Sequence, residues 1–477
     1  MNIYGIDVEL KHIPTLDPKY TPLGLFQDAF LKSAGEACPI GIAIERADSQ
    51  IASVHTFIHG THEMKDADNY YVDRLVKTLL WMKGGFKIYV SGSKDVFDYL
   101  SNAYSDGGSR DFDFHFMAHI FEHPFEVVFC DKLPESKDCP QKIGGHTEGC
   151  RIGFDAGGSD RKVSAVIDGK TVYDEEVVWF PKINEDPEYH YKEIVSALKT
   201  AASHLPRVDA VGVSSAGIFI NNRTMRASLF ASVPEEKLDD KVKDIYIRAI
   251  TNTFGDIPFS VANDGDVSAL AGKMSLDENN VLGIAMGTSE AVGYVDQDGC
   301  ITGWLNELAF VPVDCNPEAP IDEWSGDIGC GVKYFSQDAV IRLGRNAGIE
   351  LDESISPAEN LKIVQELMEK DDPKAIKVFE NIGIYLGHTL PFYYSLYKMK
   401  HVLLLGRVMS GKGGDMILSK CRRVLMDEYL EVAKNIFPDL PDEKFRRVGQ
   451  SATAATLPET RPKEPVKKRG FFSLFDK

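Results

Sequence analysis

Two stretches of the chain share one pattern: an apolar strand, a turn of small residues and a second strand. They are GFDAGGSDRKVSAVIDG at residues 153–169 and NVLGIAMGTSEAVGYVDQDG at residues 280–299. Glycine between strands carries an entropic penalty, so its use indicates that the backbone must approach something closely. A turn without side chains can bring backbone N–H groups against a phosphate. An ordinary hairpin turn explains either stretch alone, but the pair predicts a nucleotide clamped between two lobes.

The first hairpin places a carboxylate beside its bare turn. Its strand ends at Asp155, the turn runs through Gly157 and Gly158, and a hydroxyl follows at Ser159. A carboxylate can hold a hydrated Mg²⁺ that bridges phosphate oxygens. The sequence therefore makes Asp155 a candidate metal ligand, either directly or through water.

Between the two hairpins, a second carboxylate stands where a strand meets a helix. In DIPFSVANDGDVSALAG (256–272), PFSVA predicts a strand, Asn263 and Asp264 follow it, and a small-residue helix begins. Phosphoryl transfer to a hydroxyl needs positioning, a metal and one base, and Asp264 is suited to be that base. The alternative is that Asp264 or Asp266 only caps the helix; both can hold, with Asp266 as the cap and Asp264 as the base.

Composition excludes several classes of protein. A length of 477 residues predicts two or three domains. The net charge of −19 argues against a nucleic-acid binder. The eight cysteines form no CxxC pair, which is typical of a reducing cytosol. We find neither a signal peptide nor a run of 18 apolar residues, so we expect a cytoplasmic protein without an integral membrane segment.

The pattern along the chain predicts four parts. Residues 1–148 form an accessory α/β domain and linker, with residues 1–37 irregular, a hairpin turning near Asp48–Ser49, and a helix over NYYVDRLVKTLLWMK that stops at Gly84. Residues 149–262 and 263–457 form two lobes. Residues 458–477 have the composition of a disordered tail.

These motifs, taken in order, resemble the ROK family of sugar kinases, which also includes repressors. The resemblance rests on DAGGS (155–159), VGVSSAGIF (211–219), ND (263–264), GT (287–288) and LLLGRVMSGKGG (403–414). It covers about residues 151–457, where GQSATAATLP is similar to the closing helix of the family. The resemblance implies an actin-like, ribonuclease H-like two-lobe ATPase fold of class α/β, preceded here by a smaller α/β domain.

The resemblance also implies a role for each matching residue. Asp264 would be the catalytic base for a sugar hydroxyl, and ATP with Mg²⁺ at Asp155 would occupy the cleft. The residues implied in substrate binding are Asn263, Glu307 and Gly217. The residues implied in nucleotide binding are Asp155, Gly157, Gly158, Ser159, Gly287, Thr288, Ser289 and Gly406, the last of these near the nucleoside.

Three departures from the family pattern concern the second phosphate turn, the sugar and a zinc ion. Glu290 stands where the family has more glycine, and it would repel phosphate if it pointed inward. The Glu-x-Gly-His motif of the family is here Glu307-Leu308-Ala309-Phe310, and its CxCGxxGC loop corresponds to residues 323–330 with only Cys330 kept. The glutamate that follows this loop in the family is also absent. One thiolate cannot make a tetrahedral zinc site, so we expect no zinc and an altered sugar pocket.

Two functional hypotheses follow from these residues. The first is an ATP-dependent kinase of a sugar or sugar derivative; the second is a non-catalytic sugar- or nucleotide-sensing regulator or scaffold without a DNA-binding domain. Residues 44–50 lack the Gly-Gly turn, so we expect the N-terminal domain to bind no nucleotide and to serve as an interface or a cover. A homodimer stays open, as do three fates of the basic-aromatic tail: disorder without a role, docking on a partner, or membrane contact.

Overall fold

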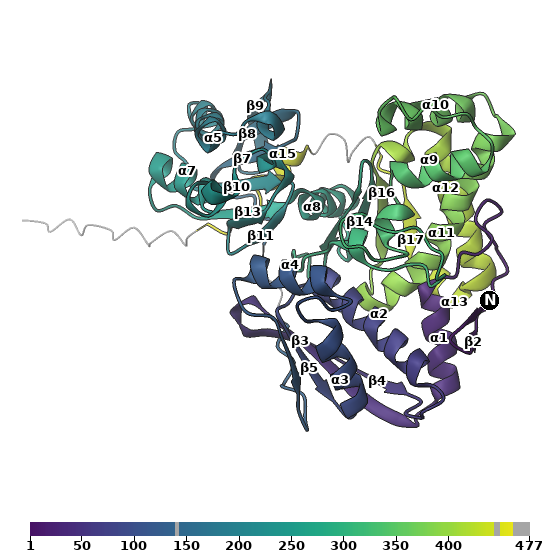
Figure 1. Ribbon diagram of the computed structural model, residues 1–477. Coiled ribbons are helices and arrows are strands. Elements are labelled where there is room, and N and C mark those ends of the chain that lie inside the picture. The colour runs from purple at the N-terminus through teal and green to yellow at the C-terminus, as the bar shows by residue number, and fades with distance from the viewer. Residues whose placement is uncertain (139–142, 443–448, 461–477) are drawn as a thin grey trace, which may run out of the picture.

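The computed structural model describes residues 1–138, 143–442 and 449–460. Within these ranges the chain builds three α/β units, each around its own sheet (Figure 1). We name them the N-terminal domain (residues 1–138), lobe 1 (β7 to β13) and lobe 2 (α8 to β17). None of the helices in the described ranges is both long enough and apolar enough to cross a bilayer.

The N-terminal domain contains a four-stranded sheet in the order β4-β3-β5-β6. Its elements are β1 (Asn2–Ile3), β2 (Ile6–Asp7), α1 (Leu23–Ala34), β3 (Cys38–Arg46), β4 (Gln50–Ile58), α2 (Lys65–Lys83), β5 (Lys87–Ser91), α3 (Lys94–Ala103), α4 (Asp111–Phe121) and β6 (Glu126–Phe129). The predicted hairpin and the helix that stops at Gly84 are confirmed. The prediction that residues 1–37 are irregular is wrong, because Leu23, Phe26 and Phe30 form the buried face of α1.

Lobe 1 is built on a five-stranded sheet in the order β13-β10-β7-β8-β9. Its elements are β7 (Cys150–Ala156), β8 (Asp160–Ile167), β9 (Lys170–Val178), α5 (Pro187–Ala202), β10 (Ala210–Ser215), β11 (Ile218–Ile220), β12 (Arg223–Arg226), α6 (Glu235–Lys237), α7 (Ile245–Phe254) and β13 (Phe259–Asn263). Both predicted hairpins are present: β7 and β8 in this lobe, and β14 and β15 in lobe 2.

Lobe 2 is built on a four-stranded sheet in the order β15-β14-β16-β17. Its elements are α8 (Asp264–Leu276), β14 (Val281–Met286), β15 (Glu290–Val295), α9 (Gln337–Asn346), α10 (Pro357–Glu369), α11 (Pro373–Tyr397), β16 (His401–Leu405), α12 (Gly411–Glu428), α13 (Leu430–Ala433) and β17 (Phe437–Asp439). Two short 3₁₀ helices matter below: η5 (Leu308–Phe310) and η7 (Arg407–Met409).

The closing helix α15 (Gln450–Ala454) returns to lobe 1 after the chain has completed lobe 2. It lies so close to β7 and β10 that a Cβ on Gly153 or Gly212 would come within 1.7 Å of a backbone oxygen of α15. Only glycine fits at such a contact. α8 and α15 therefore join the two lobes at one place (Figure 1).

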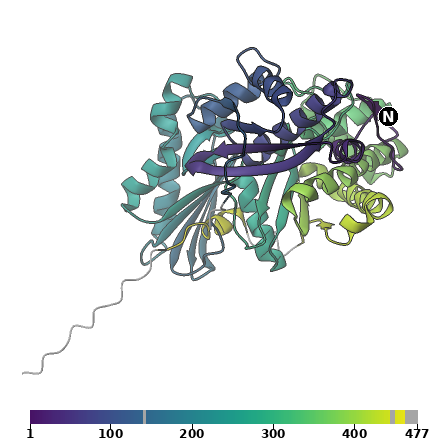
Figure 2. The ribbon, with the colours of Figure 1, turned by 90° about the horizontal axis from the view of Figure 1, so that it is seen from below.

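The N-terminal domain shares one hydrophobic core with lobe 2. The ring of Trp81 on α2 stacks on Phe310 of η5 at 4.2 Å, and Tyr20 packs against Tyr385 of α11 at 4.6 Å. Seen from below, the β3–β4 hairpin runs across the two lobes (Figure 2). The predicted domain boundaries at residues 148, 262 and 457 stay a proposal. The shared core joins residues on both sides of the first boundary, so the N-terminal domain and lobe 2 are not packed independently.

A buried ion cluster joins the N-terminal domain to the loop before η6 (Gly331–Lys333). Asp327 forms ion pairs with Arg74 at 3.1 Å, with Lys77 at 3.4 Å and with Arg110 at 2.9 Å. All four side chains are buried. The loop at 323–330 is thus held by cations of α2 and by Arg110 just before α4.

Two further aspartates complete the cluster from within the N-terminal domain. Asp73 accepts from Arg110 Nε at 2.8 Å, and Asp113 accepts from Lys77 Nζ at 3.1 Å. Although burial alone lowers the pKa of Lys77, Asp113 and Asp327 raise it above its usual value, so Lys77 stays cationic. Three cations thereby meet three carboxylates, and the cluster is neutral.

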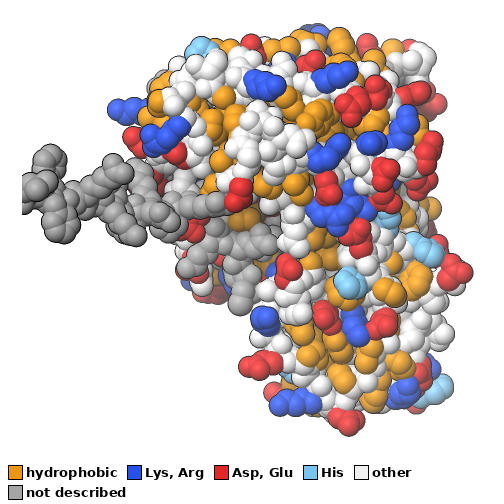
Figure 3. Space-filling view, turned by 90° about the vertical axis from the view of Figure 1, so that its left-hand side faces the viewer, with side chains coloured by type: hydrophobic (Ala, Val, Ile, Leu, Met, Phe, Trp, Pro, Cys, Tyr) orange, Lys and Arg blue, Asp and Glu red, His pale blue; other side chains and the backbone are white. Residues whose placement is uncertain are grey.

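The face of the molecule on the lobe 1 side carries no large patch of one charge. Acidic and basic side chains are interspersed there with hydrophobic ones (Figure 3). The net charge of −19 is therefore not expressed on this face as one acidic surface.

We predict that Asp327→Asn lowers the free energy of unfolding by about 3–5 kcal/mol, because it leaves a buried positive charge without a partner. Urea denaturation followed by circular dichroism measures the change. The control is Glu318→Gln, which removes an exposed carboxylate paired with Lys19 and should change stability by less than about 1 kcal/mol. Equal urea midpoints for the two variants would contradict the role given to the cluster.

Candidate functional site

Three parallel strands of lobe 1 end at one edge and bring the predicted polar residues together. β10 lies between β7 and β13, with Asp155 opposite Ser214 and with Ser215 opposite Asn263. The carboxyl ends of parallel strands are where ligands bind in open α/β sheets. This register brings Asp155 and Asn263, with Asp264 directly after it, to one edge of the sheet.

Asn263 is the N-cap of α8. Its Oδ1 accepts a hydrogen bond from Gly265 N at 2.7 Å, and its Nδ2 donates to the carbonyl of Gly217 at 2.8 Å. The suggestion that Asp266 caps the helix is wrong, because Asn263 is the N-cap residue and its side chain accepts the capping hydrogen bond. Asp266 Oδ1 instead accepts from Tyr294 N at 3.1 Å and from Asn306 Nδ2 at 3.0 Å.

Asp264 lies close enough to Asp155 to influence its titration. Burial raises the pKa of Asp155 to about 6, the hydrogen bond from Ser214 at 2.9 Å opposes this, and the charge of Asp264 adds to it. Burial also raises the pKa of Asp264. Gln450 of α15 donates to both the Ser214 hydroxyl at 3.2 Å and the Asp264 carbonyl at 2.7 Å. The closing helix therefore ties the two acidic positions together.

Glu307 and Asp266 extend this acidic group into lobe 2. Burial raises the pKa of Glu307 to about 7, and the charges of Asp264 and Asp266 contribute. Burial likewise raises the pKa of Asp266 to about 7. The backbone N–H of Glu307 donates to the carbonyl of Trp81 at the end of α2, at 3.0 Å. The N-terminal domain thereby helps to position Glu307, a residue predicted to bind the sugar.

The turn between β7 and β8 is open to solvent at Gly158 and Ser159. Trp179 fixes its shape, since its indole Nε1 donates to the carbonyl of Gly157 at 2.7 Å. The hydroxyl of Ser159 donates to Asp160 at 3.0 Å. The turn thus has the exposed, nearly bare backbone that a phosphate site requires.

The corresponding edge of lobe 2 carries the other predicted nucleotide residues. β14 and β16 are parallel, with Ala285 opposite Leu405, so Gly287 and Gly406 follow strands that end together. Gly406 has φ +92°, and a Cβ there would lie 2.3 Å from the carbonyl of Met286. Thr288 and Ser289 are exposed, and Arg407 donates to the Thr288 hydroxyl at 3.0 Å.

Glu290 does not lie at the exposed turn. Its side chain is buried and packs against Gly331. A Cβ at Gly331 would lie only 2.3 Å from Oε2 of Glu290. Burial raises its pKa to about 8, with a contribution from Glu307, and neither carboxyl oxygen has a hydrogen-bond partner among the described residues. Glu290 is therefore largely protonated at neutral pH and faces the interior of lobe 2, where it does not repel a phosphate.

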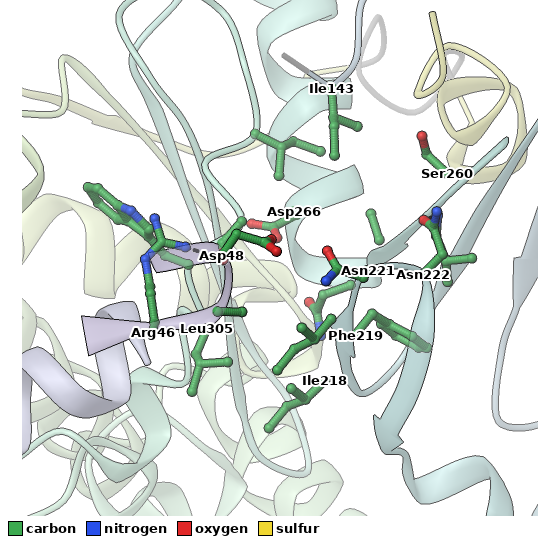
Figure 4. Close-up of a pocket in the computed structure, with 18 of the residues that line it drawn as sticks. Arg46, Asp48, Ile143, Ile218, Phe219, Asn221, Asn222, Ser260, Asp266 and Leu305 are labelled. Carbon is green, nitrogen blue, oxygen red and sulfur yellow. Dashed lines mark hydrogen bonds between the residues drawn. The ribbon is translucent and has the colours of Figure 1, made fainter. Parts of the chain in front are cut away.

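A pocket of about 310 Å³ opens beside the start of α8 (Figure 4). Asn263 and Gly217, two of the predicted substrate residues, line it, and Asp266 points into it. Glu307 and Asp264 are not among its lining residues. They lie near it, however, because the charges of Asp264 and of the lining residue Asp266 both raise the pKa of Glu307. The N-terminal domain also reaches this pocket through the tip of the β3–β4 hairpin.

Comparison with known proteins assigns the chain to a family. The model of the ROK family matches residues 151–439, which is more than half of the chain. The chain belongs to the ROK family. No curated protein matches it. The actin-like two-lobe fold predicted from the resemblance is thereby confirmed, with the N-terminal domain standing before the family region.

Solved structures of ROK proteins resemble this chain at low sequence identity. The ROK hexokinase from Thermus thermophilus is 19% identical, has a TM-score of 0.50, and aligns over 64% of this chain and 97% of its own. A Streptomyces griseus ROK glucokinase in complex with glucose and AMPPNP is 20% identical, with a TM-score of 0.47 and coverage of 64% and 98%. A ROK transcriptional regulator, a homologue of the E. coli MLC protein, is 18% identical, with a TM-score of 0.49 and coverage of 64% and 77%.

This ROK protein uses the loop at 323–330 differently from the family pattern described above. Asp327 enters the buried ion cluster, and Asp322 accepts backbone hydrogen bonds from Trp324 and Ser325 at the start of the loop. Cys330 is buried, and burial raises the pKa of its thiol to about 12. The residues on this loop are thus engaged with protein partners, and the expectation of no zinc stays a prediction.

Several residues at the site were not predicted from the sequence. Ser214 and Gln450 carry no distinctive pattern of their own, and only their positions in matched motifs could have pointed to them. Arg407 follows Gly406 directly, and its positive charge next to a predicted nucleotide-binding residue could have indicated that it belongs to the site. Asp48 was identified only as part of a polar turn.

We predict that Glu290→Gln flattens the dependence of stability on pH. A folded-state pKa near 8, above the ordinary value of 4.5, means that Glu290 stabilises the fold most below about pH 4.5 and that this contribution is lost as pH rises to about 8. Urea midpoints between pH 5 and 8 should therefore fall less in the variant than in the wild type. Glu353→Gln, at an exposed glutamate, is the control and should leave the dependence of the urea midpoint on pH unchanged. If the urea midpoints of Glu290→Gln and the wild type fell equally with pH, Glu290 would not be a buried, protonated carboxyl.

Proposed function

We propose that this ROK protein transfers a phosphoryl group from ATP to a hydroxyl of a sugar or sugar derivative, with Asp264 as general base and Mg²⁺ as the metal. The observation that carries the proposal is the position of Asp264, at the start of α8 where three parallel strands end and next to a pocket lined by Asn263. A base at this position could accept the proton of a hydroxyl held in the pocket.

The residues present fit the nucleotide and the metal. Two small-residue turns, at 157–159 and 287–289, expose their backbone to solvent at 158–159 and 288–289, and the close approach at Gly406 leaves no room for a side chain. The Asp155 carboxylate is partly exposed and would hold Mg²⁺ beside the first turn. When bound, ATP with Mg²⁺ supplies the phosphoryl group and neutralises its charge.

The chemistry of the chain's own residues follows from their titration. Burial favours protonated Asp264, so its affinity for a hydroxyl proton is higher than that of an exposed aspartate. The hydrogen bond from Gly265 N to Asp264 Oδ1 at 3.0 Å orients the carboxylate. Asn263, fixed between Gly217 and Gly265, would position the acceptor sugar, and Glu307 would add a hydrogen-bond acceptor from lobe 2.

A specific observation favours the second candidate, a non-catalytic sugar- or nucleotide-sensing regulator. Phe310 occupies the place of the family's sugar-site histidine and stacks on Trp81 of the N-terminal domain. An aromatic core contact there removes a polar ligand from the substrate region. Retention of Asp155, Asn263, Asp264 and Glu307 supports the kinase as the first choice.

A coupled ADP-release assay over hexoses, amino sugars and acetylated sugars tests the kinase. We predict that Asp264→Asn lowers kcat by on the order of 10²–10⁴ and leaves ATP binding intact, because only the proton acceptor is lost. Asp277→Asn, at the exposed opposite end of α8, is the matched control and should retain wild-type kcat. Equal turnover of Asp264→Asn and wild type would exclude Asp264 from the mechanism, whereas loss of folding would assign it a structural role.

The metal is predicted separately. Turnover should require added Mg²⁺, because the ATP phosphates and the nearby Asp155 carboxylate are both negatively charged and need a cation between them. Elemental analysis of the purified protein should find less than one zinc per chain. Stoichiometric, tightly bound zinc would show that the loop at 323–330 is wrongly matched to the family pattern.

A further inference from the structure

The tip of the β3–β4 hairpin forms one wall of the pocket beside α8. We call residues 46–50 the hairpin tip: Arg46 ends β3, residues 47–49 form the turn, and Gln50 begins β4. Arg46, Ala47, Asp48 and Gln50 all line the pocket, which Gly217 and Asn263 line from lobe 1 (Figure 4). The domain that precedes the ROK region therefore contributes directly to the candidate substrate site.

The hairpin tip is held in place by contacts with Asp138 of its own domain and with Gly303 of lobe 2. β3 and β4 pair continuously from Cys38–Ile58 to Arg46–Gln50, so the hairpin is a long, regular arm. Arg46 is buried at its end, where it pairs with Asp138 at 2.5 Å and donates to the carbonyl of Gly303 at 3.2 Å. Its Nε faces no hydrogen-bond partner among the described residues. A fixed wall, rather than a loose loop, borders the pocket.

The opposite wall is a second hairpin turn, between β11 and β12 of lobe 1. Asn221 and Asn222 both have left-handed backbone conformations, with φ +53° and +66°. Asn222 Oδ1 accepts from Val261 N at 2.8 Å, which attaches the turn to β13. Asn221 points toward the interior of the pocket (Figure 4). Two tight turns from different units thus enclose the same space.

The charge inside the pocket is acidic. Asp48 of the hairpin tip and Asp266 of α8 both line it (Figure 4). Arg46 pairs with Asp138, which it shares with Lys83, and Trp304 adds a flat aromatic surface to the lining. Hydroxyl and amino groups can donate to the exposed carboxylate of Asp48, whereas that carboxylate would repel an anionic substituent.

We propose that Asp48 of the hairpin tip is a specificity-determining residue that contacts the acceptor sugar, so that the pocket accepts neutral or amine-bearing sugars and rejects anionic ones. This inference rests on the proposed function and names the substrate class of the same site. Asp48 stands apart from the reacting hydroxyl, since Asp264 is the base. Its substitution should therefore act on sugar binding more than on the chemical step.

Asp48→Asn is a clean probe of this role. Asp48 is exposed with φ +59°, a conformation that asparagine also adopts readily, so the turn should be kept. Asp277→Asn is the matched control, because Asp277 is also exposed, has φ +57° and lies outside the pocket. Thermal melting of both variants should coincide with the wild type.

The experiment measures kcat and KM for glucose, glucosamine, N-acetylglucosamine and glucuronate, with ATP and Mg²⁺, for the wild type and both variants. We expect Asp48→Asn to raise KM for the preferred sugar about 3- to 10-fold, the range for one partly exposed charged hydrogen bond, with kcat changed less than about twofold. Discrimination against glucuronate should fall by a similar factor. Asp277→Asn should match the wild type for every sugar.

Calorimetric titration of the same sugars separates failure of this inference from failure of the proposed function. If a sugar binds but is not phosphorylated, the kinase proposal fails. The ratio of the Kd values of Asp48→Asn and the wild type for that sugar then tests the role of Asp48 by itself. If the wild type phosphorylates a sugar while Asp48→Asn keeps every KM and the same rejection of glucuronate, the specificity role is overturned and the kinase stands. Binding of none of the four sugars to the wild type overturns the inference as well.

Discussion

The carboxylate of Asp327 is the point on which the arrangement of the N-terminal domain and lobe 2 depends. Arg74, Lys77 and Arg110 reach it from the N-terminal domain, and each of these cations is buried. Buried charges without partners are strongly destabilising, so the two units cannot separate without exposing or stranding them. The apolar contact of Trp81 with Phe310 lies in the same interface. The ion cluster thereby sets where α2 lies, and α2 in turn supports the segment that carries Glu307.

The site between the lobes is built from acids that largely lack cationic partners. Asp155, Asp266 and Glu307 all have pKa values raised by burial, as does Glu290 in the adjoining interior of lobe 2. Such a group is better suited to receive a metal, protons or hydrogen-bond donors than to serve as structural ion pairs. In the cluster at Asp327, by contrast, each buried carboxylate is paired with a buried cation, and we propose that Asp155 and Glu307 are the acids that meet ligands.

The sequence predicted those features that depend on local pattern. The two strand–turn–strand units were visible because glycine is unusual between strands, and the shared edge of Asp155 and Asn263 follows once their strands run parallel. The fusion of the N-terminal domain with lobe 2 was not predictable in this way. Arg74 and Lys77 look like ordinary charges on a helix, and nothing near them in the chain indicates a partner. Asp48 likewise belongs to an unremarkable polar turn until the fold places it opposite Asn221.

The distance along the chain between the partners in the ion cluster affects how the protein can be made. Arg74 and Asp327 are 253 residues apart, and all of lobe 1 is synthesised between them. Until Asp327 emerges from the ribosome, the nascent N-terminal domain holds three cations against two carboxylates and lacks the lobe 2 half of its core. Contacts of this range form slowly, and partly folded chains that expose apolar surface tend to aggregate. Maturation of the N-terminal domain is therefore tied to translation of a loop in lobe 2.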